Sequence, residues 1–142
     1  ELLYNMKIIV AGHPRSKDNF QFGHRAIIKD KTLDLISGAE FVVAQFSTAI
    51  SFAIIKKKPL LLFFSDYMRR GGELESQYYN SIRAFSNELG CNLINIDDYQ
   101  ENSLIFKKNS KFYNQYKYKY LTSKATENIS NYEIMSDVFF KN

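Results

Sequence analysis

Short apolar runs, separated by longer amphipathic or polar segments, dominate the chain. Four of them are rich in Ile, Val, Leu and Phe and have the length of β-strands: Lys7 to Ala11, Phe41 to Ala44, Leu60 to Phe64 and Asn92 to Ile96. Their apolar residues are continuous rather than alternating, as in strands that are covered on both faces. The stretch Ala26 to Ile28 is compatible with a brief additional strand.

Helical signals fill the segments between these runs. The expected helices are Thr32 to Ile36 with Thr32 as its cap and Gly38 near its end, a second from Ser47 or Thr48 to Lys56, and a long third between Gly71-Gly72 and Leu89-Gly90. Strands and helices alternate strictly, which predicts an α/β domain of three layers, with a parallel sheet and right-handed crossovers.

The long helix has one apolar face. Its large apolar residues recur every three or four positions, at Leu74, Tyr78, Ile82, Phe85 and Leu89. This spacing predicts that the helix packs on the sheet.

The pattern changes after Ile96. The segment Asp97 to Ser110 is polar and turn-like, Phe112 to Leu121 is rich in tyrosine, and a final helix is expected from Thr126 to Phe140. Tyrosines mixed with lysines can form a stacking platform for nucleic acid, but a helix whose aromatic face packs on the domain or on a neighbour is the favoured interpretation. We expect one domain over 1–142, with the sheet core in 1–96 and a loop and carboxyl-terminal helices in 97–142.

Composition and length limit the number of cores. The chain has 142 residues, of which 45% are hydrophobic and 15% aromatic, which suffices for one core. The net charge of +4 comes from scattered lysines and arginines, which are typical of solvated faces and also favour anionic ligands. The chain begins at Glu1 without an initiator methionine and soon enters a strand, so we expect it to be a piece of a longer protein.

Cysteine usage and hydropathy indicate a reducing compartment. Cys91 is the single cysteine, which excludes an intrachain disulfide, and its place at the start of an apolar run predicts burial. No apolar run approaches the ~20 residues that span a bilayer. A soluble, cytoplasmic domain is therefore expected.

Polar residues follow the carboxyl ends of the predicted strands, where ligands bind in open parallel sheets. Gln45-Phe46-Ser47-Thr48 follows the second main strand and leads into a helix. Hydroxyls at a helix start lie beside unpaired backbone N–H groups, so Ser47 and Thr48 are candidates for binding a phosphate, with Gln45 beside them. The alternative is that these hydroxyls only cap the helix.

The first strand leads directly into Gly12-His13-Pro14-Arg15. Gly12 permits a tight turn and Pro14 stiffens the exit, so the His13 imidazole is expected to be presented to a ligand. His13 can hydrogen-bond or protonate a phosphate oxygen, and Arg15 can add a bidentate contact to the same anion. We therefore expect His13-Pro14-Arg15 and the Ser47-Thr48 turn to end neighbouring strands and to share one anionic ligand.

Two further residues are weaker candidates for sugar or ribose contacts. His24 lies in a loop that can fold over the site, and Asp66 follows the third main strand, where a carboxylate accepts hydrogen bonds from ribose hydroxyls or simply caps the next helix. The chain lacks GxGxxG, a P-loop, HExxH and CxxC. This argues against a dinucleotide dehydrogenase, a Walker-type NTPase and zinc chemistry, and we expect neither a metal nor a cofactor.

Three stretches together resemble the carboxyl-terminal, donor-binding half of GT-B glycosyltransferases: Ile8 to Arg15, Ala39 to Ala53 and Lys57 to Phe63. More narrowly, they are similar to bacterial capsule and surface-carbohydrate enzymes, including sialyltransferases and polysialyltransferases, which have an HP motif and a Ser-Ser or Ser-Thr motif. The resemblance covers roughly Lys7 to Ile96. In this chain Phe46-Ser47-Thr48 stands in place of a double serine.

The resemblance implies a Rossmann-like fold and specific residue roles. His13 of the HP motif would be catalytic, contacting the donor phosphate and assisting departure of the nucleotide, while Ser47 and Thr48 would bind that phosphate. The implied reaction is metal-independent transfer of a sugar from a nucleotide-activated donor, CMP-linked in preference to UDP-linked, in bacterial-type surface polysaccharide biosynthesis. The catalytic base and acceptor contacts would belong to an amino-terminal domain, so this chain alone is expected to be inactive. The full-length enzyme would associate peripherally with a membrane.

Other functions remain open on the same residues. A CDP-glycerol-type glycerophosphotransferase or a nucleotide-sugar 2-epimerase would use the same half-site for a different reaction. A non-enzymatic Rossmann-like module would instead dock on a partner through its aromatic carboxyl-terminal helices. RNA binding through the basic and aromatic tail is the weakest alternative, and no nucleic-acid partner is expected.

Overall fold

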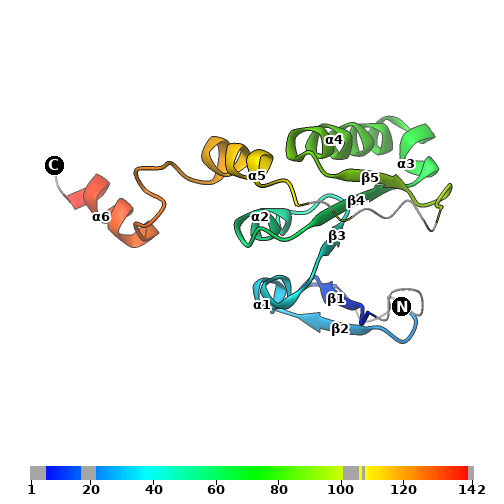
Figure 1. The fold of residues 1–142 in the computed structure, drawn as a ribbon, viewed down its shortest axis with the longest axis horizontal. Helices are drawn as coiled ribbons and strands as arrows, with labels where there is room; N and C mark the ends of the chain where they lie inside the picture. Colours follow the sequence, from blue (N-terminus) through cyan, green and yellow to red (C-terminus); the bar gives the residue numbers. More distant parts are fainter. Residues whose placement is uncertain (1–5, 17–21, 101–105, 107, 141–142) are drawn as a thin grey trace.

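The computed structural model describes residues 6–16, 22–100, 106 and 108–140, in which parallel strands are interspersed with helices (Figure 1). In chain order the elements are β1 (Ile9–Gly12), β2 (Ala26–Lys29), α1 (Thr32–Gly38), β3 (Val42–Ala44), α2 (Ile50–Ile55), β4 (Leu60–Phe64), α3 (Asp66–Arg70), α4 (Glu73–Leu89), β5 (Asn92–Asn95), α5 (Ser110–Tyr116), the π-helical turn η2 (Lys117–Leu121) and α6 (Asn131–Phe140).

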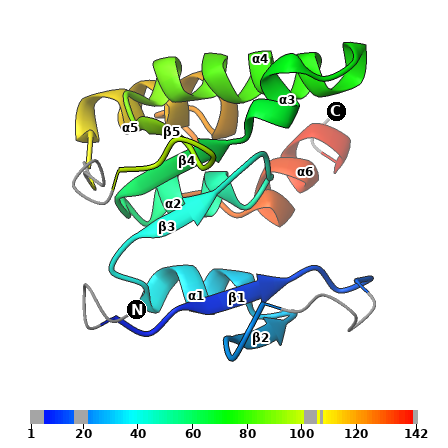
Figure 2. The same ribbon diagram turned by 90° about the vertical axis from the view of Figure 1, so that its right-hand side faces the viewer.

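The strands form two parallel sheets. β1 pairs with β2 with Ile9 opposite Ala26, and β3, β4 and β5 form a three-stranded sheet with β4 in the middle. The prediction of an α/β fold with parallel strands is therefore confirmed, including the brief strand at β2. The expectation of a single sheet is not met, because β1 and β3 belong to different sheets within the described residues. Helix α1 contacts both β1 and α2 and so joins the two sheets (Figure 2).

The hydrophobic core surrounds the three-stranded sheet. The apolar run of β4 is buried as predicted for a strand covered on both faces, with Leu60, Leu61 and Leu62 all inaccessible or nearly so. The other core residues come from helices and from the start of β5: Ile36 of α1, Ile50, Ala53 and Ile54 of α2, Ile82 and Leu89 of α4, Cys91, and Tyr113 and Tyr116 of α5. Burial of Cys91 is confirmed, and desolvation raises the pKa of its thiol to about 11.

Helix α4 begins and ends at the predicted glycines. Gly72 occupies its N-cap position, and Gly90 closes it in a left-handed conformation with φ of 58°. The predicted apolar face is buried only toward the carboxyl end, because Ile82 and Leu89 are 0% exposed whereas Leu74 is 61% and Tyr78 48% exposed. At about 1.5 Å per residue this helix is roughly 25 Å long, whereas strands of four or five residues reach only about 17 Å, so the first turns of α4 extend past the sheet.

The shorter helices differ slightly from their predicted starts. Lys31 rather than Thr32 holds the N-cap position of α1, without a side-chain capping bond. The final helix begins at Asn131 instead of Thr126, because Ser130 and Glu133 form a capping box there. The Glu133 N–H donates to Ser130 Oγ (3.2 Å), and the Ser130 N–H donates to Glu133 Oε2 (2.8 Å).

The tyrosine-rich segment packs on the domain through two of its rings. Tyr113 and Tyr116 of α5 are buried, and the Tyr113 hydroxyl donates a hydrogen bond to the Lys58 carbonyl (2.9 Å). Burial raises the pKa of Tyr113 to about 12. The interpretation of this segment as a helix that packs on the domain is thus confirmed for these tyrosines. No helix in the described ranges is long and apolar enough to cross a membrane.

Gly12 lies where two side chains of β2 leave no room for a side chain on β1. A Cβ at this position would lie 2.8 Å from Ile27 Cγ2 and 3.1 Å from Lys29 Cγ. The sequence assigned Gly12 to a tight turn, but it is the last residue of β1, and the glycines with positive φ among the described residues are Gly23 and Gly90. Close strand packing, rather than backbone freedom, therefore requires glycine here.

We expect Gly12→Ala to lower the free energy of unfolding by about 1–3 kcal/mol, because the Ile27 methyl is attached to a β-branched carbon and has little freedom to move aside. Gly38→Ala is the matched control, since nothing lies within 4 Å of the Cβ that it would add at the end of α1. The control should be neutral or stabilising by up to about 1 kcal/mol. Urea denaturation followed by circular dichroism measures both effects, and equal losses would contradict the packing argument.

Candidate functional site

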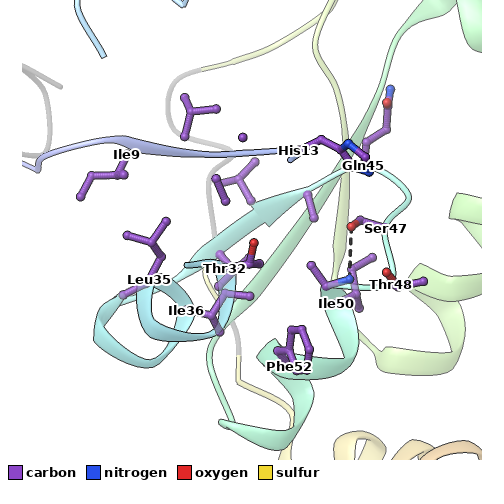
Figure 3. A pocket seen from close by; sticks show the side chains of 18 of the residues that line it. Ile9, His13, Thr32, Leu35, Ile36, Gln45, Ser47, Thr48, Ile50 and Phe52 are labelled. Atoms are coloured by element: carbon purple, nitrogen blue, oxygen red, sulfur yellow. Dashed lines mark hydrogen bonds between the residues drawn. The ribbon is translucent and has the colours of Figure 1, made fainter. Parts of the chain in front are cut away.

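A cavity of about 690 Å³ lies between the two sheets. Its walls include every residue of β1 and of β3, and α1 and α2 contribute Thr32, Leu35, Ile36, Ile50 and Phe52 (Figure 3). The volume falls within the range of about 300–1,000 Å³ that is usual for small-molecule sites. One end of the cavity lies at the carboxyl ends of β1 and β3, where ligands bind in open parallel sheets.

Five of the predicted site residues line this cavity: His13, Pro14, Gln45, Ser47 and Thr48. They come from the loops that follow β1 and β3, which are far apart in the sequence. In the close-up, His13, Gln45, Ser47 and Thr48 lie at one end of the cavity, and the aliphatic Ile9 and Leu35 lie toward the other, with Thr32 beside Ile36 (Figure 3). The cavity therefore has a polar end of hydrogen-bonding groups and a largely apolar remainder.

His13 is held by a turn built from local hydrogen bonds. Its Nδ1 accepts from the Arg15 N–H (3.1 Å), and its carbonyl accepts from the Ser16 N–H (2.9 Å) and from Ser16 Oγ (2.7 Å). A nitrogen that accepts a hydrogen bond carries no proton, so the proton of the neutral imidazole is assigned to Nε2. Nε2 is then a hydrogen-bond donor.

The Ser47-Thr48 turn is also held by local hydrogen bonds. The Ala49 N–H donates to Ser47 Oγ (3.2 Å), while the Ile50 and Ser51 N–H groups donate to the carbonyls of Ser47 and Thr48 (3.1 Å each). Ser47 thus closes a local turn ahead of α2, whose N-cap residue is Ala49 without a side-chain capping bond, and the Ser47 hydroxyl proton can still be donated to a ligand. The helix itself starts later than predicted and has six residues. The dipole of so short a helix is small, so recognition of an anion here depends on the hydroxyls.

Phe46 and Gln45 attach this turn to the rest of the domain. The Phe46 ring meets Tyr78 and Phe85 of α4 edge-on, with centroids 6.4 and 5.8 Å apart. Gln45 Nε2 lies 2.8 Å from Met68 Sδ of α3. The sequence analysis did not predict that Phe46 packs on α4. The signal for such an anchor was an aromatic residue between polar residues directly after a strand.

Three predicted residues are absent from the cavity lining: Arg15, His24 and Asp66. Arg15 contributes its backbone N–H to His13, and its side chain is exposed. His24 lies in an exposed turn, from which Phe22, two residues earlier, contributes to the cavity wall.

Asp66 begins α3 and its carboxylate already has several partners. Oδ1 accepts from Arg69 (2.7 Å) and Asn95 (2.9 Å), and Oδ2 pairs with Arg70 (3.5 Å). Ser65 caps this helix, because its Oγ accepts from the Met68 N–H. Asp66 thus links the start of α3 to β5, outside the cavity lining, and its role as a ribose acceptor stays a prediction.

Among the residues that the structure describes, no three His, Cys, Asp or Glu side chains come together as ligands of a metal would. Comparisons of the chain with models of protein families, with curated proteins and with solved structures found no significant match.

The His13 geometry predicts its tautomer. At alkaline pH, where imidazole is neutral, we expect the ¹⁵N chemical shifts of His13 to show a protonated Nε2 and an unprotonated Nδ1, because Nδ1 accepts the Arg15 N–H. His24 is the internal reference, since it lies in an exposed turn outside the cavity lining. A His13 signal typical of a protonated Nδ1 would contradict the assignment.

Proposed function

We propose that this chain is the donor-nucleotide-binding half of a GT-B glycosyltransferase with a Rossmann-like fold. It would hold a nucleotide-activated sugar, with CMP-linked donors preferred, for transfer into a bacterial-type surface polysaccharide. One observation carries the proposal. The His13-Pro14 and Ser47-Thr48 segments, which are distant in the sequence, line the polar end of one nucleotide-sized cavity at the carboxyl ends of β1 and β3.

The polar end of the cavity offers hydrogen-bond donors that suit a phosphate. His13 Nε2 and the hydroxyls of Ser47 and Thr48 can each donate to a phosphate oxygen, and the Gln45 side chain lies beside them. When the bond between the sugar and the phosphate breaks, negative charge grows on the departing phosphate oxygen. A positioned donor stabilises that charge, and the Nε2–H of the neutral His13 imidazole is such a donor. This is the role that we assign to His13.

The donor half alone does not complete the reaction. Sugar transfer also needs a group that activates the acceptor, and among the described residues the cavity lining contains no carboxylate. We assign that group to a separate acceptor-binding domain, as in enzymes whose sites are assembled by domain closure. The isolated chain should therefore bind nucleotide without transferring sugar.

A non-enzymatic interaction module is the second candidate function, and α6 is the observation that favours it. The helix exposes apolar side chains along its length, with Tyr132 80% and Phe139 65% exposed. If the chain forms a stable oligomer by light scattering and binds none of the nucleotides tested below, this function is preferred over the transferase.

Calorimetric titration with CMP, CDP, UMP and UDP tests the transferase proposal. We expect the cytidine nucleotides to bind, and His13→Ala or Ser47→Ala to weaken binding by about ten- to a hundredfold, because a hydrogen bond to a charged group contributes about 1.5–3 kcal/mol.

His24→Ala is the matched control, since it removes an exposed histidine from outside the cavity lining and should leave the affinity unchanged. Circular dichroism should show that each variant is folded. Absence of binding at millimolar nucleotide, or undiminished binding by the double variant His13→Ala/Ser47→Ala, would refute the proposal.

A further inference from the structure

One wall of the cavity is the backbone edge of β3. Among the described residues, β3 pairs with β4 alone, and all three residues of β3 line the cavity that separates it from β1 (Figure 2). The same strand leads directly into the loop that carries Ser47 and Thr48. The free edge of β3 therefore lies next to the polar end of the cavity.

Val43 is the residue of β3 that directs its backbone groups into the cavity. The Val42 N–H donates to the Pro59 carbonyl beside β4 (2.9 Å). Successive residues of a strand direct their N–H and C=O groups to opposite sides, so Val43 directs both of its groups away from β4. Such groups need polar partners whenever a ligand displaces water from them.

The two backbone groups of Val43 form a donor next to an acceptor. The N–H and C=O of an extended residue point the same way, which is why two opposed residues of a sheet can exchange two hydrogen bonds. The Watson–Crick edge of a pyrimidine has the complementary order. Cytosine has its N4 amino donor beside the N3 acceptor, and uracil has its N3–H donor beside the O4 acceptor. A pyrimidine can therefore form both hydrogen bonds with this one residue.

Apolar side chains that line the same cavity are partly exposed. Ile9 of β1 is 40% exposed, Val43 is 51% and Phe52 of α2 is 39%. Proteins that take a single base into a pocket hydrogen-bond its Watson–Crick edge and pack its faces between apolar or aromatic side chains. The cavity offers both kinds of contact.

We propose that the backbone N–H and C=O of Val43 recognise the base of the bound nucleotide. The inference rests on the proposed function, because a phosphate held by the Ser47 and Thr48 hydroxyls limits where the base can lie. Val43 precedes Ser47 by four residues, which is at most about 14 Å of extended chain. A nucleoside monophosphate can span that length along β3. Val43 then supplies affinity for the base, and a preference for cytosine over uracil depends on other groups.

Other occupants of this part of the cavity meet only one of its two requirements. A hydrocarbon chain would cover Ile9 and Phe52 but would leave the Val43 groups without partners, which is costly once water is excluded. A second sugar would supply partners for Val43, but its remaining hydroxyls would themselves need partners beside apolar side chains. A planar base with a polar edge satisfies both requirements.

Calorimetric titration with CMP and with ribose 5-phosphate tests the base contact, because ribose 5-phosphate lacks only the base. We expect CMP to bind at least about tenfold more tightly. The CMP analogue whose base is 2-pyrimidinone lacks the N4 amino group and should bind about three- to tenfold more weakly than CMP, since the Val43 carbonyl loses its donor. If CMP binds no more tightly than ribose 5-phosphate or than this analogue, the inference is overturned and the phosphate site remains.

Two variants at Val43 assign the contact to the backbone. Val43→Pro removes the N–H that faces the cavity and spares the hydrogen bonds to β4. It should weaken CMP binding about tenfold or more and leave ribose 5-phosphate binding unchanged. Val43→Ala is the matched control, because it shortens the side chain but keeps the N–H, and it should bind CMP with the affinity of the parent.

Circular dichroism shows whether each Val43 variant is folded. Undiminished CMP binding by folded Val43→Pro means that the inference is wrong, although the proposed function stands. If Val43→Pro does not fold, the comparison of CMP with the 2-pyrimidinone analogue on the parent protein decides.

Failure of CMP to bind would refute the proposed function, and Val43 then has a separate readout. The ¹⁵N-labelled protein is titrated with cytidine, which has the base without the phosphate. A shift of the Val43 amide signal that ribose 5-phosphate does not produce keeps the base contact. No shift, or the same shift with ribose 5-phosphate, overturns it.

Discussion

The burial of β4 is the constraint on which the rest of the structure depends. This strand is hydrogen-bonded on both edges, to β3 and to β5, and its leucines lie in the core that α2, α4 and α5 complete. Its register fixes where β3 ends and therefore where the loop that follows β3 begins. The position of the Ser47-Thr48 turn is therefore set by the pairing of β3 with β4. The turn itself is exposed and makes no direct contribution to the core.

The two halves of the candidate site are supported unequally. The loop after β3 is tied to α4 through Phe46 and to α3 through Gln45. The loop after β1 is held by the turn around His13 and by the Lys29 ammonium, which donates to the Ser16 carbonyl (2.8 Å). It extends from a sheet whose apolar residues remain partly exposed. A ligand that contacts both loops would therefore organise the His13 side more than the Ser47 side, because the Ser47 side is already attached to the core.

Local signals in the sequence predicted the elements well, and their long-range pairing poorly. The run at β4 and the glycines that bracket α4 specify structure within a few residues, so their bounds agree with the prediction. The split of the sheet was not predictable, because pairing of β1 with β3 depends on contacts across the chain. The same limit explains Gly12, whose need for a small residue comes from Ile27 on another strand. It also explains Asp66, whose ion pairs with Arg69 and Arg70 and hydrogen bond from Asn95 become visible only in the fold.

The polar end of the cavity can recognise an anion through neutral hydrogen-bond donors rather than through positively charged side chains. Arg15 lies outside the cavity lining, and the groups that remain are hydroxyls, an amide and an imidazole that presents Nε2. Neutral donors have a smaller desolvation cost than ammonium or guanidinium groups, so they can be enclosed more readily. Their strength then depends on alignment and on exclusion of water, since a hydrogen bond to an anion gains most in a medium of low polarity.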